Sequence, residues 1–60
     1  MATLTTKELG SINDLLVSEQ LKINKAEHYA SQVSDPELRA EFLRERDLHA
    51  QHFKKLYELL

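Results

Sequence analysis

Two long helical patterns meet at Ser34-Asp35-Pro36-Glu37, and this short stretch decides the fold. Asp35 is a favoured N-cap residue, and Pro36 suits the first helical position, where a missing N–H leaves no hydrogen bond unmade. Glu37 adds a carboxylate to the first turn, where the helix dipole favours negative charge. One helix therefore ends and another begins within a few residues, so the second helix must fold back antiparallel to the first.

The first helix is expected over residues 6–32. Thr5-Thr-Lys-Glu8 matches a capping box, with Thr5 as N-cap and Glu8 at the third helical position. Residues then recur at alternating three- and four-residue spacing, which is the pattern of a helix seam. This seam consists of Leu9, Ile12, Leu16, Glu19, Ile23, Ala26, Ala30 and Val33. Leu15 and Tyr29 widen its apolar face, and Val17 and Leu21 predict a second buried contact elsewhere on the helix.

The second helix is expected over residues 36–59, with its own stripe at helical spacing. The stripe consists of Leu38, Phe42, Glu45, His49, His52, Leu56 and Leu59. A carboxylate and two imidazoles thus interrupt an otherwise apolar face, where unsatisfied polar groups are costly. The function of the protein therefore depends on which partner, a protein group, water or a metal ion, binds these three polar side chains.

The composition fits one small helical domain over residues 1–60. The chain has no cysteine, one glycine, one proline, a formal net charge of −2 and 30% charged residues of both signs. This excludes disulfide and thiolate metal sites, and the lack of a basic block argues against nucleic acid. No apolar run reaches the roughly 20 residues that span a bilayer, and the start does not resemble a secretory signal. An intracellular protein without a membrane partner is the default expectation.

A lone hairpin of this size leaves half of each apolar stripe in water, and so short a chain is marginally stable alone. Two hairpins packed together bury both stripes. The sequence therefore predicts an all-α fold in which a homodimer forms an antiparallel four-helix bundle, with helices crossing at roughly 20°.

The polar residues of the two helices are predicted to meet. In a hairpin that turns near Ser34, residues whose numbers sum to about 68 lie at the same height. Glu19 is then level with residue 49, and His49 and His52 are three apart on one helix face. Glu19, His49 and His52 are the candidate metal ligands, and Glu45 is either a further ligand or an acceptor for the remaining ring N–H of His49.

Three interpretations of this cluster are open from the residues alone. Carboxylate and imidazole together suit a transition metal such as Zn, Fe or Mn better than Ca or Mg. The same side chains can instead hydrogen-bond to one another and set helix register and dimer partner. As long side chains on the edge of a seam, they can also simply reach water. His28 lies away from the seam and is expected on the surface.

Several motifs together resemble the spore coat protein F family of spore-forming Firmicutes, over nearly the whole chain. They are Thr5-Thr-Lys-Glu-Leu9, Ser18-Glu19-Gln20-Leu21, Ala26-Glu-His-Tyr29, Asp35-Pro36-Glu37-Leu38 and His49-Ala-Gln-His52-Phe53. The resemblance implies a ferritin-like helical bundle, a spore coat or sporulating-cell setting, and other coat proteins as partners. Longer relatives carry two hairpins in one chain, so this chain would need a second copy.

The resemblance also shows a departure from ferritin-like di-iron sites, which use a Glu on one helix and Glu-x-x-His on its partner. Glu19 matches the first element, but His49-x-x-His52 stands where Glu-x-x-His is expected. Fewer carboxylates favour a single structural ion, or none, over oxygen chemistry. The leading hypothesis is a non-enzymatic structural protein of the spore coat type. The alternatives are a metal-dependent redox or metal-handling protein and a helical adaptor for another protein.

Overall fold

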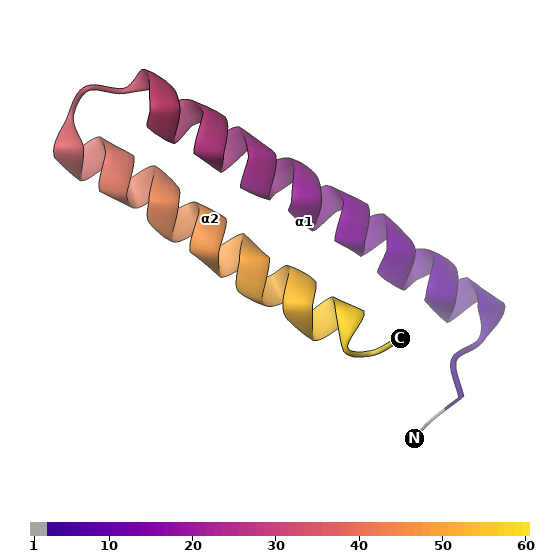
Figure 1. Ribbon diagram of the computed structural model, residues 1–60. Helices are drawn as coiled ribbons and strands as arrows, with labels where there is room; N and C mark the ends of the chain where they lie inside the picture. Colours follow the sequence, from indigo (N-terminus) through magenta and orange to yellow (C-terminus); the bar gives the residue numbers. More distant parts are fainter. Residues whose placement is uncertain (1–2) are drawn as a thin grey trace.

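The computed structural model describes residues 3–60, which form two antiparallel helices joined by a short turn (Figure 1). Helix α1 spans Thr6–Gln32 and helix α2 spans Pro36–Tyr57. The helices lie side by side, and the start of α1 is at the same end of the hairpin as the end of α2. The predicted all-α helical hairpin is confirmed, and α1 has the predicted bounds.

The capping box at the start of α1 is confirmed in both directions. The Glu8 backbone N–H donates to Thr5 Oγ1 at 3.1 Å, and the Thr5 backbone N–H donates to Glu8 Oε1 at 2.9 Å. The backbone N–H of Thr5, and then its side chain, stabilise the carboxylate and lower the pKa of Glu8 below its usual 4.5. The start of α1 is therefore specified by local hydrogen bonds that need no tertiary contact.

The turn is held by side chains from both sides of it. Asp35 Oδ1 accepts from the backbone N–H groups of Glu37 at 2.8 Å and Leu38 at 3.2 Å, which confirms its predicted role as N-cap. Arg39 reaches back from α2 and donates from Nη2 to the carbonyl of Val33 at 2.8 Å. This bond satisfies a carbonyl that the end of α1 leaves free, and it ties the two helices together at the turn.

Helix α2 ends at Tyr57, two residues before the predicted boundary at residue 59. The backbone N–H of Leu59 bonds to the carbonyl of Leu56 at 3.1 Å, and that of Leu60 bonds to Tyr57 at 3.1 Å. These are i to i−3 bonds, so the last turn tightens from α to 3₁₀ geometry. The apolar spacing of the sequence extends to Leu59, two residues past the point where the backbone leaves α-helical hydrogen bonding.

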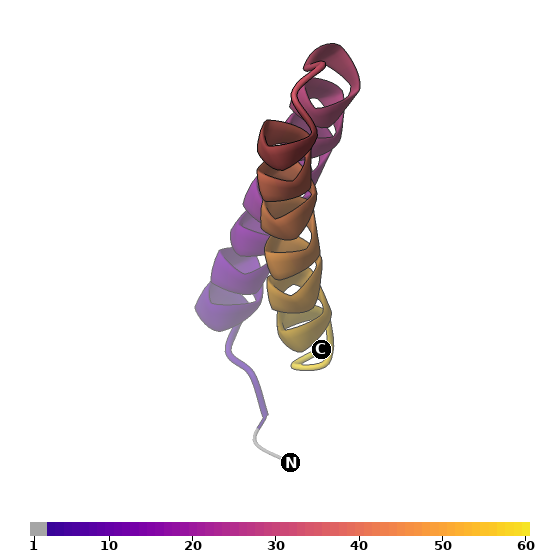
Figure 2. The ribbon, with the colours of Figure 1, turned by 90° about the vertical axis from the view of Figure 1, so that its left-hand side faces the viewer.

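The seam between the helices is thin. The molecule measures 47 × 17 × 9 Å, and Figure 2 shows the two helices crossing at a shallow angle in a single layer. Among the described residues, no large side chain is fully buried, and a short set is mostly covered by the partner helix. That set consists of Ile12, Glu19, Ala26 and Ala30.

The stripe of α2 that faces α1 differs from the predicted one. Phe42, His49 and Leu56 are half-buried as expected, but Arg46 and Phe53 take the inner positions assigned to Glu45 and His52. Both stripes have the same four-three spacing and share three members, so periodicity does not separate them. Burying the phenyl ring of Phe53 stabilises the fold by about 2 kcal/mol, whereas an imidazole is better placed where its nitrogens reach polar partners.

Other apolar residues remain exposed within one hairpin. Leu38 and Leu59, at the two ends of the predicted α2 stripe, are 45% and 57% exposed. Val17 and Leu21 are 54% and 56% exposed, so the second buried contact predicted for them is not formed in the hairpin. His28 is exposed, as predicted.

Candidate metal centre

Glu19 is the central residue of the polar cluster and the most buried charged group in the described chain. It lies between Leu16 and Ile23 in the seam of α1, and the whole residue is only 9% exposed. A buried carboxylate keeps its charge only where partners replace water. Its two oxygens face two different histidines of α2.

His49 is the first partner. Its Nδ1 lies 2.6 Å from Glu19 Oε2, with the two side chains 18% and 11% exposed. This direct contact confirms the prediction that residues 19 and 49 lie at the same level along the hairpin. A short bond between an imidazole nitrogen and a carboxylate is charge-assisted and stronger than a neutral hydrogen bond.

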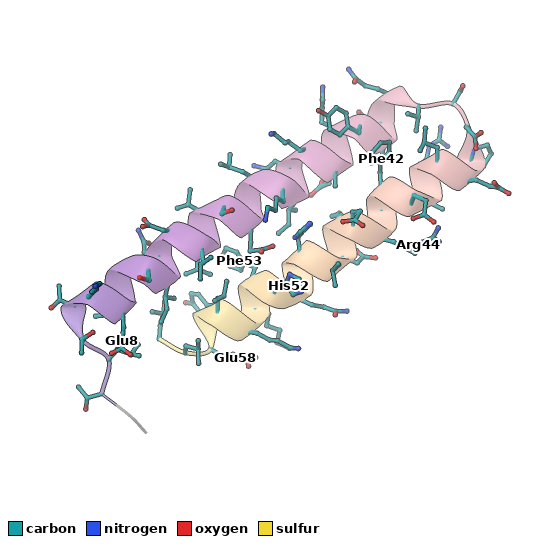
Figure 3. All side chains as sticks on the ribbon, turned by 180° about the vertical axis from the view of Figure 1, so that it is seen from behind. Glu8, Phe42, Arg44, His52, Phe53 and Glu58 are labelled. Carbon is teal, nitrogen blue, oxygen red and sulfur yellow. The ribbon has the colours of Figure 1, made fainter. Side chains whose placement is uncertain are left out.

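His52 is the second partner and lies at the edge of the hairpin. Its Nδ1 is 3.7 Å from Glu19 Oε1, and its side chain is 45% exposed. Figure 3 shows His52 on α2, and His49 precedes it by three residues on the same helix. The two imidazole rings meet edge to face, with centroids 5.7 Å apart and an interplanar angle of 80°. Both rings thus converge on one carboxylate from a single helix.

Glu45 lies on the far side of the His49 ring. Its Oε2 is 3.5 Å from His49 Nε2, and its side chain is 58% exposed. When His49 presents Nδ1 toward Glu19, the other ring nitrogen points at Glu45. A carboxylate in that place orients a metal-binding imidazole and raises its basicity, which is one of the two roles predicted for Glu45.

The ligand atoms of Glu19, His49 and His52 all lie within 4.8 Å of one another. Two ligand atoms on one tetrahedral zinc are about 3.3 Å apart, given bond lengths near 2.0–2.1 Å. The 2.6 Å contact must therefore open slightly and the 3.7 Å contact must close slightly to hold an ion. An ion held by these three side chains would take the place of the proton between His49 and Glu19.

Without an ion, the cluster holds one hydrogen bond, between His49 and Glu19, and two longer contacts, from His52 to Glu19 and from His49 to Glu45. Over residues 3–60, every buried side-chain nitrogen and oxygen has a hydrogen-bond partner. The geometry thus accommodates both the metal site and the register network that the sequence left open. It rules out the third alternative for Glu19 and His49, because neither side chain is on a solvated edge, whereas His52 is partly exposed to solvent.

Aromatic residues lie on both sides of the cluster along the hairpin. Toward the turn, the rings of Tyr29 and Phe42 have centroids 5.4 Å apart. Toward the open end, Phe53 stacks against Tyr57 with centroids 6.4 Å apart. Figure 3 shows Phe42 and Phe53 directed from α2 into the seam. Phe42 thus meets Tyr29 across the seam on one side of the cluster, whereas the stacked pair on the other side lies within α2.

Arg46 is a residue near the site that the predicted stripe does not include. The predicted stripe has Glu45 facing α1, but Arg46 is the half-buried residue on the inner side of α2. Its guanidinium pairs with the neighbouring Asp47, with Nη2 2.9 Å from Oδ1. The signal was present in the alternative stripe that runs from Phe42 through residues 46, 49 and 53.

Neither α1 nor α2 is long and apolar enough to cross a membrane, judged over the described residues. No family model, curated protein or solved structure matches the chain.

Proposed function

We propose that this chain is a small structural helical protein that holds one transition-metal ion between Glu19, His49 and His52. The observation that carries the proposal is the convergence of three ligand atoms within 4.8 Å from two different helices. Mixed nitrogen and oxygen donors suit Zn, Fe or Mn. An ion bound there links α1 to α2 at mid-length, so its binding free energy stabilises the hairpin.

A structural role suits the donor set better than oxygen chemistry. One buried carboxylate and two imidazoles supply one negative charge, which is too little to bridge two irons in the manner of a four-carboxylate centre. The proposed setting is the spore coat or the sporulating cell, with other coat proteins as partners, and its support is the resemblance of the helix caps and His49-Ala-Gln-His52-Phe53 to the spore coat protein F family. Equal abundance in growing and sporulating cells would overturn this setting.

The assembly we propose is a homodimer that forms a ferritin-like four-helix bundle. It is supported by the thin seam between the helices. Ten large apolar side chains of the described hairpin are exposed, and no large side chain of any kind is fully buried there. Exposed apolar surface on this scale marks an interaction site. A second hairpin is the simplest partner for this apolar surface, because a two-fold interface buries the same surface on both copies.

Elemental analysis of untagged, full-length protein after size fractionation tests the metal site and the assembly together. We expect about one Zn, Fe or Mn per chain at the elution volume of a dimer, a ratio set by one cluster per hairpin. His49→Ala combined with His52→Ala should remove the ion. His28→Ala is the matched control, because His28 is an exposed histidine outside the cluster, and it should keep the ion.

Two results would contradict the metal site. One is purified protein without a stoichiometric ion that also binds none of Zn²⁺, Fe²⁺ or Mn²⁺ in titration. The other is equal loss of metal in the His28→Ala control and in the His49→Ala/His52→Ala variant, which would indicate nonspecific binding. If the protein binds none of these ions and its stability still depends on His49, the cluster sets helix register instead.

A further inference from the structure

Three exposed apolar side chains, drawn from both helices, share one side of the hairpin. At 100° per residue, Leu15 and Tyr29 project from α1 on the same side of the seam as Leu38 and His52 from α2. Figure 3 is drawn looking onto the side that carries His52. We call this surface the His52 face. It consists of Leu15, Tyr29, Leu38 and His52, and the same geometry puts the exposed carboxylate of Glu45 on it.

The area left uncovered matches what one partner contributes to a dimer. The chain exposes 4861 Å². A compact folded protein of 7.0 kDa exposes about 4,000 Å². The excess of roughly 800 Å² equals the surface that each partner buries in a standard-size interface. A second hairpin on one face would therefore bring the exposed area to that of an ordinary folded chain.

The metal cluster lies at the middle of this face. Glu19 is the fourteenth of the 27 residues of α1, so equal lengths of helix extend on either side of it. A two-fold axis across the middle of the face exchanges its two apolar ends, so that the turn end of one hairpin covers the open end of the other. The same axis places the half-exposed side of His52 against the second copy.

We propose that a second copy of this chain docks on the His52 face, and that metal binding and dimerisation strengthen each other. This inference rests on the proposed metal site and names the surface that completes it. The second copy excludes water from the exposed side of His52, which strengthens the electrostatic attraction between the ion and Glu19. In return, the ion holds His52 in the orientation that the second copy contacts. Linkage requires the two effects to have the same size.

Sedimentation velocity of the full chain over a range of concentrations, with EDTA or with saturating Zn²⁺, measures the coupling. We expect Zn²⁺ to lower the dimer dissociation constant at least about tenfold, within the usual range of 5–150-fold for coupled sites. His52→Ala should abolish the Zn²⁺ effect, because it removes the ligand that belongs to both the cluster and the face.

A matched pair of variants tests the face itself. Leu15→Gln lies on the His52 face, whereas Leu21→Gln lies on the outer side of the same helix, and the two leucines are 50% and 56% exposed. Glutamine is uncharged, so it does not repel an ion near His52. We expect Leu15→Gln to weaken the dimer about tenfold, as loss of an interface anchor does, and Leu21→Gln to leave it unchanged.

The outcomes separate this inference from the proposed function. Zinc content is read independently by elemental analysis, so a chain that keeps its ion but whose dimer ignores Zn²⁺ overturns the coupling alone. Equal dimerisation by Leu15→Gln and Leu21→Gln, or a stronger effect at Leu21, overturns the face. Circular dichroism over the same range of protein concentrations measures the helix content of each variant and so identifies variants that lose structure. For Leu15→Gln, helix content that recovers with concentration shows weakened dimerisation and supports the inference. Helix content lost at every concentration excludes that variant, and Leu38→Gln, on the same face, then replaces it and should weaken the dimer about tenfold.

Discussion

Replacing His49 with alanine tests the most specific contact of the structure, the 2.6 Å bond between His49 Nδ1 and Glu19 Oε2. The substitution removes the main partner of a carboxylate whose side chain is 11% exposed. What remains is His52, at 3.7 Å. We therefore expect His49→Ala to destabilise the protein even when no metal is present.

The size of the effect follows from the burial of the pair. Removing one partner of a fully buried charge pair costs about 3–5 kcal/mol, and a hydrogen bond to a charged group contributes about 1.5–3 kcal/mol. The side chains here keep 11% and 18% exposure, so the lower range applies, and we expect about 1.5–3 kcal/mol. A 60-residue domain has a total stability of roughly 3–9 kcal/mol, so this loss is a large fraction of it.

The partner substitution should behave differently. Glu19→Met removes the carboxylate itself and places a flexible apolar side chain between Leu16 and Ile23. It ends the cost of burying a charge, so we expect a change within about 1 kcal/mol of zero, of either sign. In the Glu19→Met background, His49→Ala should then cost less than about 1 kcal/mol, because no buried charge is left without a partner.

Urea denaturation followed by circular dichroism gives all four corners of this cycle. Protein concentration must be the same throughout, since the stability of a dimer depends on it, and EDTA keeps the metal out. Repeating the series with Zn²⁺ at 100 times its dissociation constant should stabilise only the wild-type protein, by about 2.7 kcal/mol. An equal cost of His49→Ala in both backgrounds would refute the reasoning, because Glu19 and His49 would then not be coupled.

Three further predictions concern the helices. Gly10→Ala should stabilise the hairpin by about 0.5–1 kcal/mol in urea denaturation, because an added Cβ meets no atom within 4 Å, and destabilisation would show that Gly10 lies at a close contact with another chain. Asp35→Ala should cost about 1 kcal/mol by loss of the N-cap, while Ser34→Ala beside it should change little, and equal effects would contradict the capping geometry. Glu8→Ala should be less stable than wild type near neutral pH, since folding lowers the pKa of Glu8 and favours its ionised form. This contribution is complete above pH 4.5 and is lost as the pH falls through the lowered pKa, so the unfolding midpoints of Glu8→Ala and wild type should converge in acid, and a gap that persists would contradict the role of the charged cap.

The helix boundaries were largely predictable because they depend on local chemistry. Thr5 with Glu8 and Asp35 with Pro36 are signals whose hydrogen bonds lie within four residues of chain, and the structure has both caps where the sequence placed them. The end of α2 has no such cap, and there the prediction ran two residues too far. Boundaries were thus as reliable as the local signals that mark them.

The meeting of Glu19 with His49 was also predictable, for a geometric reason. A short turn leaves one register for two rigid helices, and a rise of 1.5 Å per residue then sets every pair of heights. Rotation of α2 about its own axis is a different matter. The stripe through Glu45 and His52 and the stripe through Arg46 and Phe53 have the same spacing, so the sequence pattern supports both.

The sequence by itself determined two helices, their antiparallel pairing and the height at which a carboxylate meets two imidazoles. These follow from caps, spacing and helical rise, all of which act over a few residues. Only the tertiary structure decided which side of α2 faces α1, because that choice depends on the competition between Phe53 and His52 for the same covered position. Phe53 takes the seam, and His52 is left at its edge with a 45% exposed ring, where one side reaches Glu19 and the other is open to solvent.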